Sequence, residues 1–282
     1  MLERIKPAVT LGRHSATVSR LLLAWTAVTI GLPAYGADIK IAGRAAVLME
    51  IRAGKILWQR NQDQLLAPAS TTKILTALVA LDRSKLDDVV KVPREATLAT
   101  GGTVHLHAGE QLSVEQLLYG MLLGSANDAA IALAIHTGGS VAKFVDLMNG
   151  EARHLGAKRS NFHNPTGLPQ KGHVTTAREL AMITRAALAN PRFRRIVASK
   201  KQAWKSAKWQ GELKNSNVLL ETYRGAIGVK TGQTSEAGFC LVAAAARGEE
   251  SFVAVILKST EKSGWQDARN LLDHGFKNYT AN

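Results

Sequence analysis

Residues 225–257 read GAIGVKTGQTSEAGFCLVAAAARGEESFVAVIL, and this stretch decides the fold. It contains three strand-like runs, at 225–231, 238–246 and 252–257, and RGEE at 247–250 is typical of a hairpin turn between the last two. Strands that follow one another through tight turns pair antiparallel. The stretch therefore predicts an antiparallel sheet near the C-terminal end of the chain.

Both ends of the chain contribute strands to the predicted sheet. Two further strand-like runs lie at 44–51 and 55–59, and residues 265–276 place apolar side chains at helical spacing after the last strand. Helical patterns dominate from Thr71 to about Ala189. The sequence thus predicts an α+β fold: a five-stranded, mostly antiparallel sheet flanked by terminal helices, with an all-helical lobe, roughly residues 65–200, inserted in it.

Three helices of the inserted lobe can be placed from local signals. Residues 71–81 are apolar on nearly every side, which predicts a buried helix. Ser113 and Gln116 have the spacing of a capping box and predict the start of a second helix. Asn127 or Asp128 is expected to cap a third helix over 129–135.

The net charge of the chain and its first 36 residues indicate where the protein is located. The 282 residues carry a net charge of +14, which suits an anionic partner such as nucleic acid or a cell-envelope surface. Basic residues precede an uncharged apolar run at 21–32, and Ala34 and Gly36 are the small residues that a signal peptidase requires. Twelve apolar residues are few for a membrane span. Retention of this segment as an uncleaved membrane anchor is the alternative that stays open.

We therefore expect residues 1–36 to be a signal peptide and residues 37–282 to be the exported catalytic domain, periplasmic or in the cell envelope or extracellular. After cleavage it should have no stable membrane anchor. No C-terminal β-domain is expected after residue 282. An exported protein rarely meets nucleic acid, so the positive charge is better explained by an anionic wall or membrane surface than by a nucleic-acid partner.

Cysteine and histidine indicate no metal site. The single cysteine, Cys240, lies in an apolar strand-like run and is expected in the core, which excludes an internal disulfide and a thiolate cluster. His105 and His107 alternate as they would on one exposed strand face, and the chain has no His-Glu-x-x-His pattern. The sequence therefore predicts no metal and no cofactor.

The first chemical motif is Ser70 followed by Lys73 at the start of the buried helix, where the two side chains share a face. A poorly solvated lysine can lose its proton and act as the base that a serine nucleophile needs. The helix N-terminus supplies N–H groups for an oxyanion. The pattern alone is weak, because Ser-x-x-Lys also occurs at Ser140 and Ser259, where a helix cap and a solvated lysine are sufficient explanations.

Two further motifs occur once each. In Ser125-Ala126-Asn127, the serine can relay a proton to a leaving amine, and the asparagine can hold a substrate amide by donating and accepting at once. In Lys230-Thr231-Gly232, a basic side chain and a hydroxyl at a strand end suit a terminal carboxylate, and Gly232 lets a substrate backbone approach closely. The three motifs in this order are specific together although each is modest alone.

From about Ala37 to Phe276 the sequence resembles the low-molecular-mass penicillin-binding proteins of the D-alanyl-D-alanine carboxypeptidase family. The resemblance implies that Ser70 forms an acyl-enzyme, that Lys73 is its base and that Ser125 assists proton transfer. It further implies that Asn127 holds the substrate amide, that Lys230 and Thr231 receive the terminal carboxylate, and that the N–H groups of Ser70 and Gln233 form an oxyanion hole. The expected partners are peptidoglycan stem peptides and, as covalent inhibitors, β-lactam antibiotics.

Three alternatives stay open. Relatives with this short architecture include D,D-endopeptidases that cut cross-links, and Gln233 stands where relatives often have an aromatic residue or histidine. A β-lactamase would share the motifs, but residues 156–177 contain no acidic residue to activate the deacylating water. A non-catalytic wall-binding module would require a broken motif, and all motif residues are present.

Overall fold

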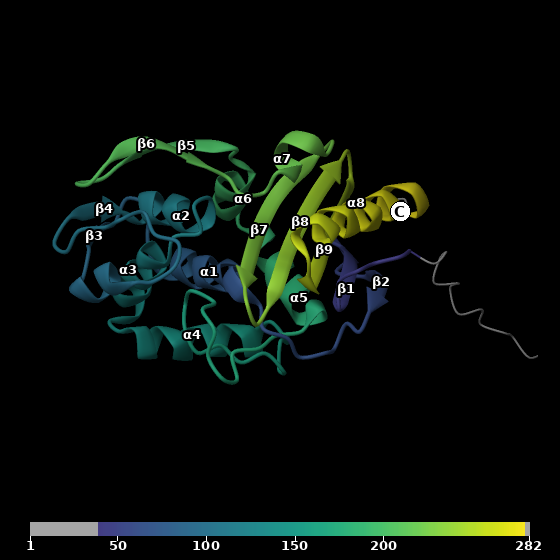
Figure 1. Ribbon diagram of the computed structural model, residues 1–282, viewed down its shortest axis with the longest axis horizontal. Helices are drawn as coiled ribbons and strands as arrows, with labels where there is room; N and C mark the ends of the chain where they lie inside the picture. Colours follow the sequence, from purple (N-terminus) through teal and green to yellow (C-terminus); the bar gives the residue numbers. More distant parts are fainter. Residues whose placement is uncertain (1–38, 280–282) are drawn as a thin grey trace, which may run out of the picture. The chain divides into compact units, whose positions relative to one another are not determined.

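A five-stranded sheet organises the computed structural model, which describes residues 39–279 (Figure 1). Its strands stand in the order β2-β1-β9-β8-β7, and every neighbouring pair is antiparallel. The predicted α+β fold and five-stranded sheet are confirmed. The strand bounds are β1 Ala45–Glu50, β2 Ile56–Arg60, β7 Ala226–Thr234, β8 Gly238–Arg247 and β9 Glu250–Ser259.

The central strands are buried on both faces, which explains why they read as almost continuous apolar runs. Successive side chains of a strand point to opposite faces. Val242 and Val255 belong to the core shared with the helical region, whereas Ala243 and Ile256 pack with the C-terminal helix α8 (Glu261–Asn278). The predicted turn at 247–250 is present, since Arg247 pairs with Glu250 across a two-residue loop.

The region between β2 and β7 is mainly helical and holds most of the remaining elements. It also contains two small two-stranded sheets, β3–β4 and β5–β6, which no sequence signal indicated. The elements are η1 Ala69–Thr72, α1 Lys73–Arg83, β3 Val89–Lys91, η2 Arg94–Leu98, β4 Gln111–Ser113, α2 Val114–Leu122, α3 Asn127–Gly138, α4 Val141–His154, α5 Ala177–Ala189, α6 Pro191–Ala198, β5 Lys201–Lys205, β6 Gln210–Lys214 and α7 Leu219–Thr222.

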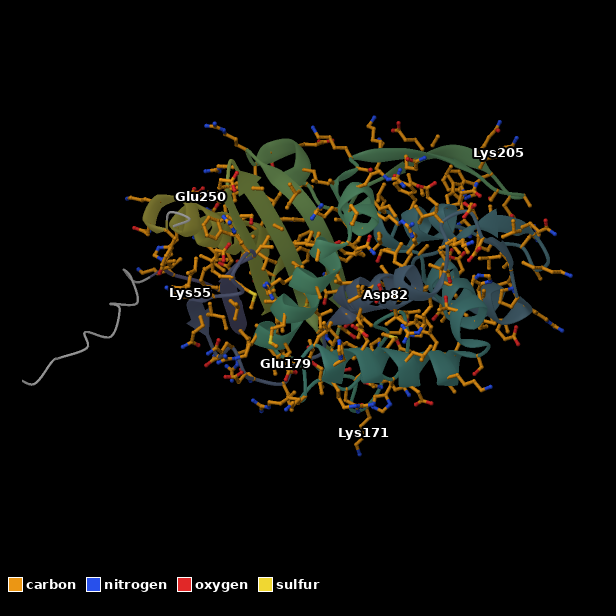
Figure 2. The ribbon with its side chains drawn as sticks, turned by 180° about the vertical axis from the view of Figure 1, so that it is seen from behind. Lys55, Asp82, Lys171, Glu179, Lys205 and Glu250 are labelled. Carbon is orange, nitrogen blue, oxygen red and sulfur yellow. The ribbon has the colours of Figure 1, made fainter. Side chains whose placement is uncertain are left out.

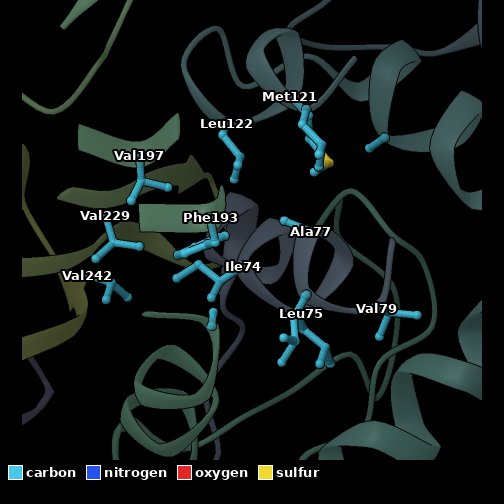
Figure 3. Close-up of a cluster of buried hydrophobic side chains, with 14 of the residues drawn as sticks. Ile74, Leu75, Ala77, Val79, Met121, Leu122, Phe193, Val197, Val229 and Val242 are labelled. Atoms are coloured by element: carbon cyan, nitrogen blue, oxygen red, sulfur yellow. The ribbon is translucent and has the colours of Figure 1, made fainter. Parts of the chain in front are cut away.

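Helix α1 runs through the interior, as the apolar sequence of its residues predicted. Every residue from Lys73 to Leu81 is buried. Ile74 at its first turn lies with Phe193 of α6 and with Val229 and Val242 of the sheet (Figure 3). This packing fixes the start of α1 beside strand β7, and Figure 1 shows the two elements next to each other.

Charged side chains cover the outside of the described region (Figure 2). Lys55, Lys171 and Lys205 are exposed examples from widely separated parts of the chain. Among residues 39–279 no single helix is both long and apolar enough to cross a bilayer; α3 and α4 reach that length and composition only as a pair bent by 84°. The predicted signal peptide at 1–36 lies outside the described residues.

Candidate active site

Ser70 lies on the short helix η1, and Lys73 is the first residue of α1, which continues η1 directly. Lys73 Nζ is 3.1 Å from Ser70 Oγ, so the predicted pair is in contact. Ala69, just before the serine, has a φ of 47°, in the left-handed region that non-glycine residues rarely occupy. Such conformations persist where the surrounding structure imposes them and are frequent at active sites.

The Lys73 amine is surrounded by three oxygen acceptors. Besides Ser70 Oγ, it donates to Asn127 Oδ1 at 2.7 Å and to the backbone carbonyl of Thr166 at 2.6 Å. Burial lowers the pKa of Lys73 well below its ordinary value, the nearby charge of Lys230 lowers that pKa further, and Asp128 opposes the shift. A neutral Lys73 amine would keep two hydrogens for the two carbonyl oxygens, which leaves its lone pair facing Ser70 Oγ.

The second motif lies directly across from this pair. Asn127 Nδ2 donates to the carbonyl of Thr100 at 2.7 Å, and the Asn127 backbone N–H donates to the carbonyl of Gly102. Ser125 has a φ of 57°, a second non-glycine residue in the left-handed region, and its side chain lines the same cleft as Ser70. The loop between α2 and α3 therefore presents Ser125 and Asn127 together to the Ser70–Lys73 pair.

Strand β7 forms the opposite wall and approaches Ser70 very closely. A Cβ atom added at Gly232 would lie 2.6 Å from Ser70 N, so only glycine allows this contact. Thr231 Oγ1 is 2.7 Å from Ser216 Oγ, which places two hydroxyls side by side at the cleft. Lys230 is buried behind this wall, its Nζ donates to the carbonyl of Thr231, and burial lowers its pKa to about 7.

These walls enclose a cleft of about 320 Å³. The structure thus brings five of the predicted residues to one cleft and places Lys73 and Lys230 in the protein immediately behind it. The lining residues are Ser70, Gly101, Gly102, Ser125, Asn127, Gly167, Leu168, Ser216, Thr231, Gly232, Gln233, Thr234, Phe239, Glu261 and Trp265.

Sequence reasoning missed several contributors to this cleft. Thr166 acts through its backbone carbonyl, and the identity of a side chain gives no signal for such a role. Ser216 belongs to none of the three motifs, and its place beside Thr231 depends on tertiary packing. Glu261 and Trp265 come from the start of α8 and reach the cleft only because that helix packs on β8, the strand that pairs with β7.

Two predictions around the site need correction. Neither Asn127 nor Asp128 caps α3 with its side chain: the N-cap residue is Ala126, and Asn127 Oδ1 accepts from Lys73 instead. The side chain of Asp128, the second residue of α3, accepts from the backbone N–H groups of Val104 and Leu106 as well as from that of the next residue, Ala129. Because that carboxylate accepts from these backbone donors, residues 104–107 form no strand, contrary to expectation. His105 and His107 are exposed, as predicted.

The other two Ser-x-x-Lys sequences lie outside the cleft, as expected. Ser140 caps α4, as expected, by accepting from the backbone N–H of Lys143 at 3.2 Å. The expected cap at Ser259 is wrong, because Ser259 is the last residue of β9 and Thr260 caps α8 instead. Cys240 is buried in the core, where burial raises the pKa of its thiol to about 11. Within the part of the chain that the structure describes, no three His, Cys, Asp or Glu side chains gather in a way that could hold a metal ion.

Comparison with known proteins gives a consistent result. A family model described as D-alanyl-D-alanine carboxypeptidase matches residues 33–261. The carboxypeptidase DacF of Bacillus subtilis is 36% identical over 251 residues, which are 84% of this chain but only 62% of DacF. Among solved structures, a variant of the DD-transpeptidase of Streptomyces K15 has a TM-score of 0.81 at 34% identity, covering 85% of this chain and 100% of that one. A penicillin-binding protein homologue from Mycobacterium tuberculosis has a TM-score of 0.83 at 35% identity, covering 89% and 97%.

Proposed function

The chain belongs to the D-alanyl-D-alanine carboxypeptidase family, and on that premise we propose that it removes the terminal D-alanine from peptidoglycan stem peptides through an acyl-enzyme on Ser70. The observation that carries this proposal is the arrangement around Lys73. Its two carbonyl acceptors hold the amine so that, once neutral, it can take the proton of Ser70 Oγ 3.1 Å away. Ser70 then attacks the carbonyl carbon of the penultimate D-alanine.

The developing oxyanion lies between strand β7 and the N-terminus of η1. The backbone N–H groups of Ser70 and Gln233 are the proposed donors, because both residues line the cleft and Gly232 brings the two segments into contact. Donors fixed by the backbone need no reorganisation as charge develops. The substrate carboxylate is proposed to bind the hydroxyls of Thr231 and Ser216, in the positive field of Lys230.

Collapse of the tetrahedral intermediate breaks the peptide bond and releases D-alanine. Its amine needs a proton, which Ser125 is proposed to relay from the protonated Lys73, since Ser125 lines the cleft opposite Ser70. Water then attacks the ester, with the same lysine as base, and restores Ser70. β-Lactams, which resemble the dipeptide, are proposed to acylate Ser70 and to leave slowly.

Slow release is consistent with the surroundings of Glu179, the acidic residue that follows the segment 156–177 in which a class A β-lactamase would carry its deacylating glutamate. Glu179 on α5 accepts from the Arg159 backbone N–H at 2.8 Å and from Ser160 Oγ at 2.6 Å, and it does not line the cleft. Both carboxylate oxygens of Glu179 therefore already accept hydrogen bonds from neighbouring residues. This arrangement leaves Glu179 unable to activate water at the acyl-enzyme, which favours a peptidase over a class A β-lactamase.

Mass spectrometry distinguishes the proposed carboxypeptidase from a D,D-endopeptidase. The protein is incubated with a pentapeptide ending in D-alanyl-D-alanine and, separately, with a cross-linked muropeptide dimer. Loss of one alanine from the pentapeptide with the dimer intact supports the carboxypeptidase. Cleavage of the dimer with the pentapeptide intact would establish the endopeptidase instead, and binding of both without cleavage would indicate a wall-binding module.

Ser70→Ala tests the nucleophile directly. We expect this variant to lose both turnover and covalent labelling by penicillin, because the attacking oxygen is gone. Ser140→Ala is the matched control, since it removes the serine of a second Ser-x-x-Lys sequence that serves only as a helix cap. A Ser70→Ala protein that penicillin still labels would disprove the assignment.

We also propose that the protein is exported, in keeping with a substrate in the cell wall. The apolar run at 21–32 and the small residues before Ala37 support cleavage after Gly36. The intact mass of protein recovered from the cell envelope or medium tests this, and we expect a chain that begins at Ala37. Recovery of the full 282-residue chain from the membrane would indicate a retained anchor.

A further inference from the structure

The cleft has a second end that the proposed reaction does not use. Strand β7 is the edge strand of the sheet, and its residues 231–234 all line the cleft. Ser216 and Thr231 mark the carboxylate end of this strip. At the other end lie Glu261 and Trp265 from the start of α8, and the Trp265 ring packs on Phe239 with a centroid distance of 5.3 Å.

The direction of a bound peptide follows from these two ends. An extended peptide can add to an exposed sheet edge by pairing with its backbone. Extended chains rise about 3.3 Å per residue, so with the terminal residue at Thr231 the third residue from the peptide's C-terminus lies about 7 Å further along, near Gln233. Gln233 pairs with Phe239 in the sheet, so this end of β7 is also the end that Trp265 covers.

The chemistry of this end is an apolar surface next to a negative charge. Glu261 is the one charged side chain among the residues lining the cleft of the described chain. It is exposed, and it belongs to none of the four ion pairs found within residues 39–279. Trp265 is half-buried against Phe239, which holds its ring as a fixed apolar surface.

We propose that Glu261 and Trp265 form a subsite for the third residue from the substrate's C-terminus, and that it selects a long aliphatic side chain ending in a free ammonium group. The aliphatic part packs on Trp265, and the ammonium pairs with the Glu261 carboxylate. The inference rests on the proposed function, because it names the substrate side chain that the same site binds. A stem peptide whose amine has been converted to an amide would lose this charge and bind less well.

Two tripeptides test the subsite: Nα-acetyl-L-lysyl-D-alanyl-D-alanine and its Nα,Nε-diacetyl counterpart, which differ only in the side-chain charge. We expect kcat/KM of the wild-type protein to be about threefold to fivefold higher for the free amine, the range of a solvent-exposed ion pair. This preference should shrink at high salt, because exposed charges are screened.

Glu261→Gln should remove the preference, because the amide has no charge to pair with the ammonium group. Glu236→Gln is the control: it makes the same change of charge at an exposed residue of the β7–β8 turn that does not line the cleft. Equal use of both peptides by the wild type, or a preference that survives in Glu261→Gln, overturns the subsite and leaves the carboxypeptidase intact. Failure of the wild type to cleave either peptide contradicts the proposed function itself.

Discussion

The proposed mechanism requires opposite charge states of two buried lysines of the site. Lys73 must be neutral to accept the Ser70 proton, whereas Lys230 must be charged to attract a carboxylate. Burial lowers the pKa of both, that of Lys230 to about 7. As pH falls through the lowered pKa of Lys73, the base is lost; as pH rises through about 7, the charge of Lys230 is lost. We therefore expect a bell-shaped pH profile of kcat/KM.

The alkaline side of this profile can be assigned with one variant. An arginine keeps its charge at every accessible pH, so Lys230→Arg should move the alkaline fall in kcat/KM to higher pH while it leaves the acid side in place. The measurement is the pH dependence of D-alanine release from the Nα,Nε-diacetyl peptide, whose terminal carboxylate is its only charge near pH 7. An alkaline fall that stays near pH 7 in Lys230→Arg would assign it to another group.

The buried side chain of His173 forms a hydrogen bond with Thr72, the residue just before Lys73. The backbone N–H of His163 donates to His173 Nδ1, so the proton of His173 is on Nε2, which donates to Thr72 Oγ1 at 2.9 Å. Burial, with a smaller effect of His163, lowers the pKa of His173 to about 4. Its pKa in the unfolded chain is about 6.5, so between these values the unfolded state binds more protons than the folded state. Stability therefore falls as pH drops from about 6.5 to about 4.

The expected loss from this one group is on the order of 3 kcal/mol in the free energy of unfolding. Urea unfolding at pH 7 and pH 4.5 measures it, and His173→Gln should lose much less stability between the two pH values than the wild type does. His154→Gln is the control, because His154 is exposed. If His173→Gln shows the same pH dependence as the wild type, His173 is not the group that titrates.

At the scale of elements, the loop around Gly167 holds η1 in place. A Cβ atom at Gly167 would lie 1.9 Å from the carbonyl oxygen of Ala69, and its φ is +82°. We expect Gly167→Ala to displace the loop, with loss of penicillin labelling and of stability, since the same loop supplies the Thr166 carbonyl to Lys73. Gly150→Ala in α4 is the control: nothing lies within 4 Å of an added Cβ, so stability should rise by up to about 1 kcal/mol. Both are measured by thermal unfolding and labelling, and undiminished labelling of Gly167→Ala would contradict the role of the loop.

The elements that the sequence predicted well are those whose pattern is local. The strands over 238–246 and 252–257, and the capping box of Ser113 and Gln116, all depend on neighbouring residues, and all are present. The failures have distant causes. Asp128 leaves the cap of α3 because it satisfies backbone donors about 24 residues earlier in the chain, at Val104.

The same distinction applies to the candidate site. Ser70, Lys73, Ser125 and Asn127 could be named from motifs because each acts through a characteristic side chain. The Thr166 carbonyl and the Glu261–Trp265 end of the cleft could not, since they reach the site through tertiary packing. The sequence also left open that Lys230 would be buried behind the cleft wall, which depends on how β7 packs against η1.

At the scale of the whole described region, the sheet joins both ends of the chain around the inserted helices. Strand β1 pairs with β9 over six residues, and the carboxylate of Asp267 on α8 accepts from the backbone N–H groups of Ala42 and Gly43 at 2.8–3.1 Å. The segment that enters the sheet is thus held by the last helix. Because α1 packs directly on this sheet, neither part can unfold without exposing the core of the other.

Asp267→Asn tests this coupling. An amide replaces one acceptor oxygen with an NH2 group that would face a backbone N–H group, and it removes the charge that strengthens these bonds, so we expect a loss on the order of 2 kcal/mol in the free energy of unfolding. Asp63→Asn is the control: Asp63 pairs with Arg178 at the surface, where such pairs contribute less than about 1 kcal/mol.

Unfolding is followed by fluorescence of Trp204 and Trp209 in the β5–β6 hairpin, with the other tryptophans replaced by phenylalanine, and by far-UV circular dichroism. Since Trp204 is buried against the helical region and Asp267 lies beyond the sheet, coupled unfolding requires both signals to shift together in Asp267→Asn. A circular dichroism transition that moves to lower urea while the Trp204 signal stays in place would show that the helical region is stable without the closed sheet.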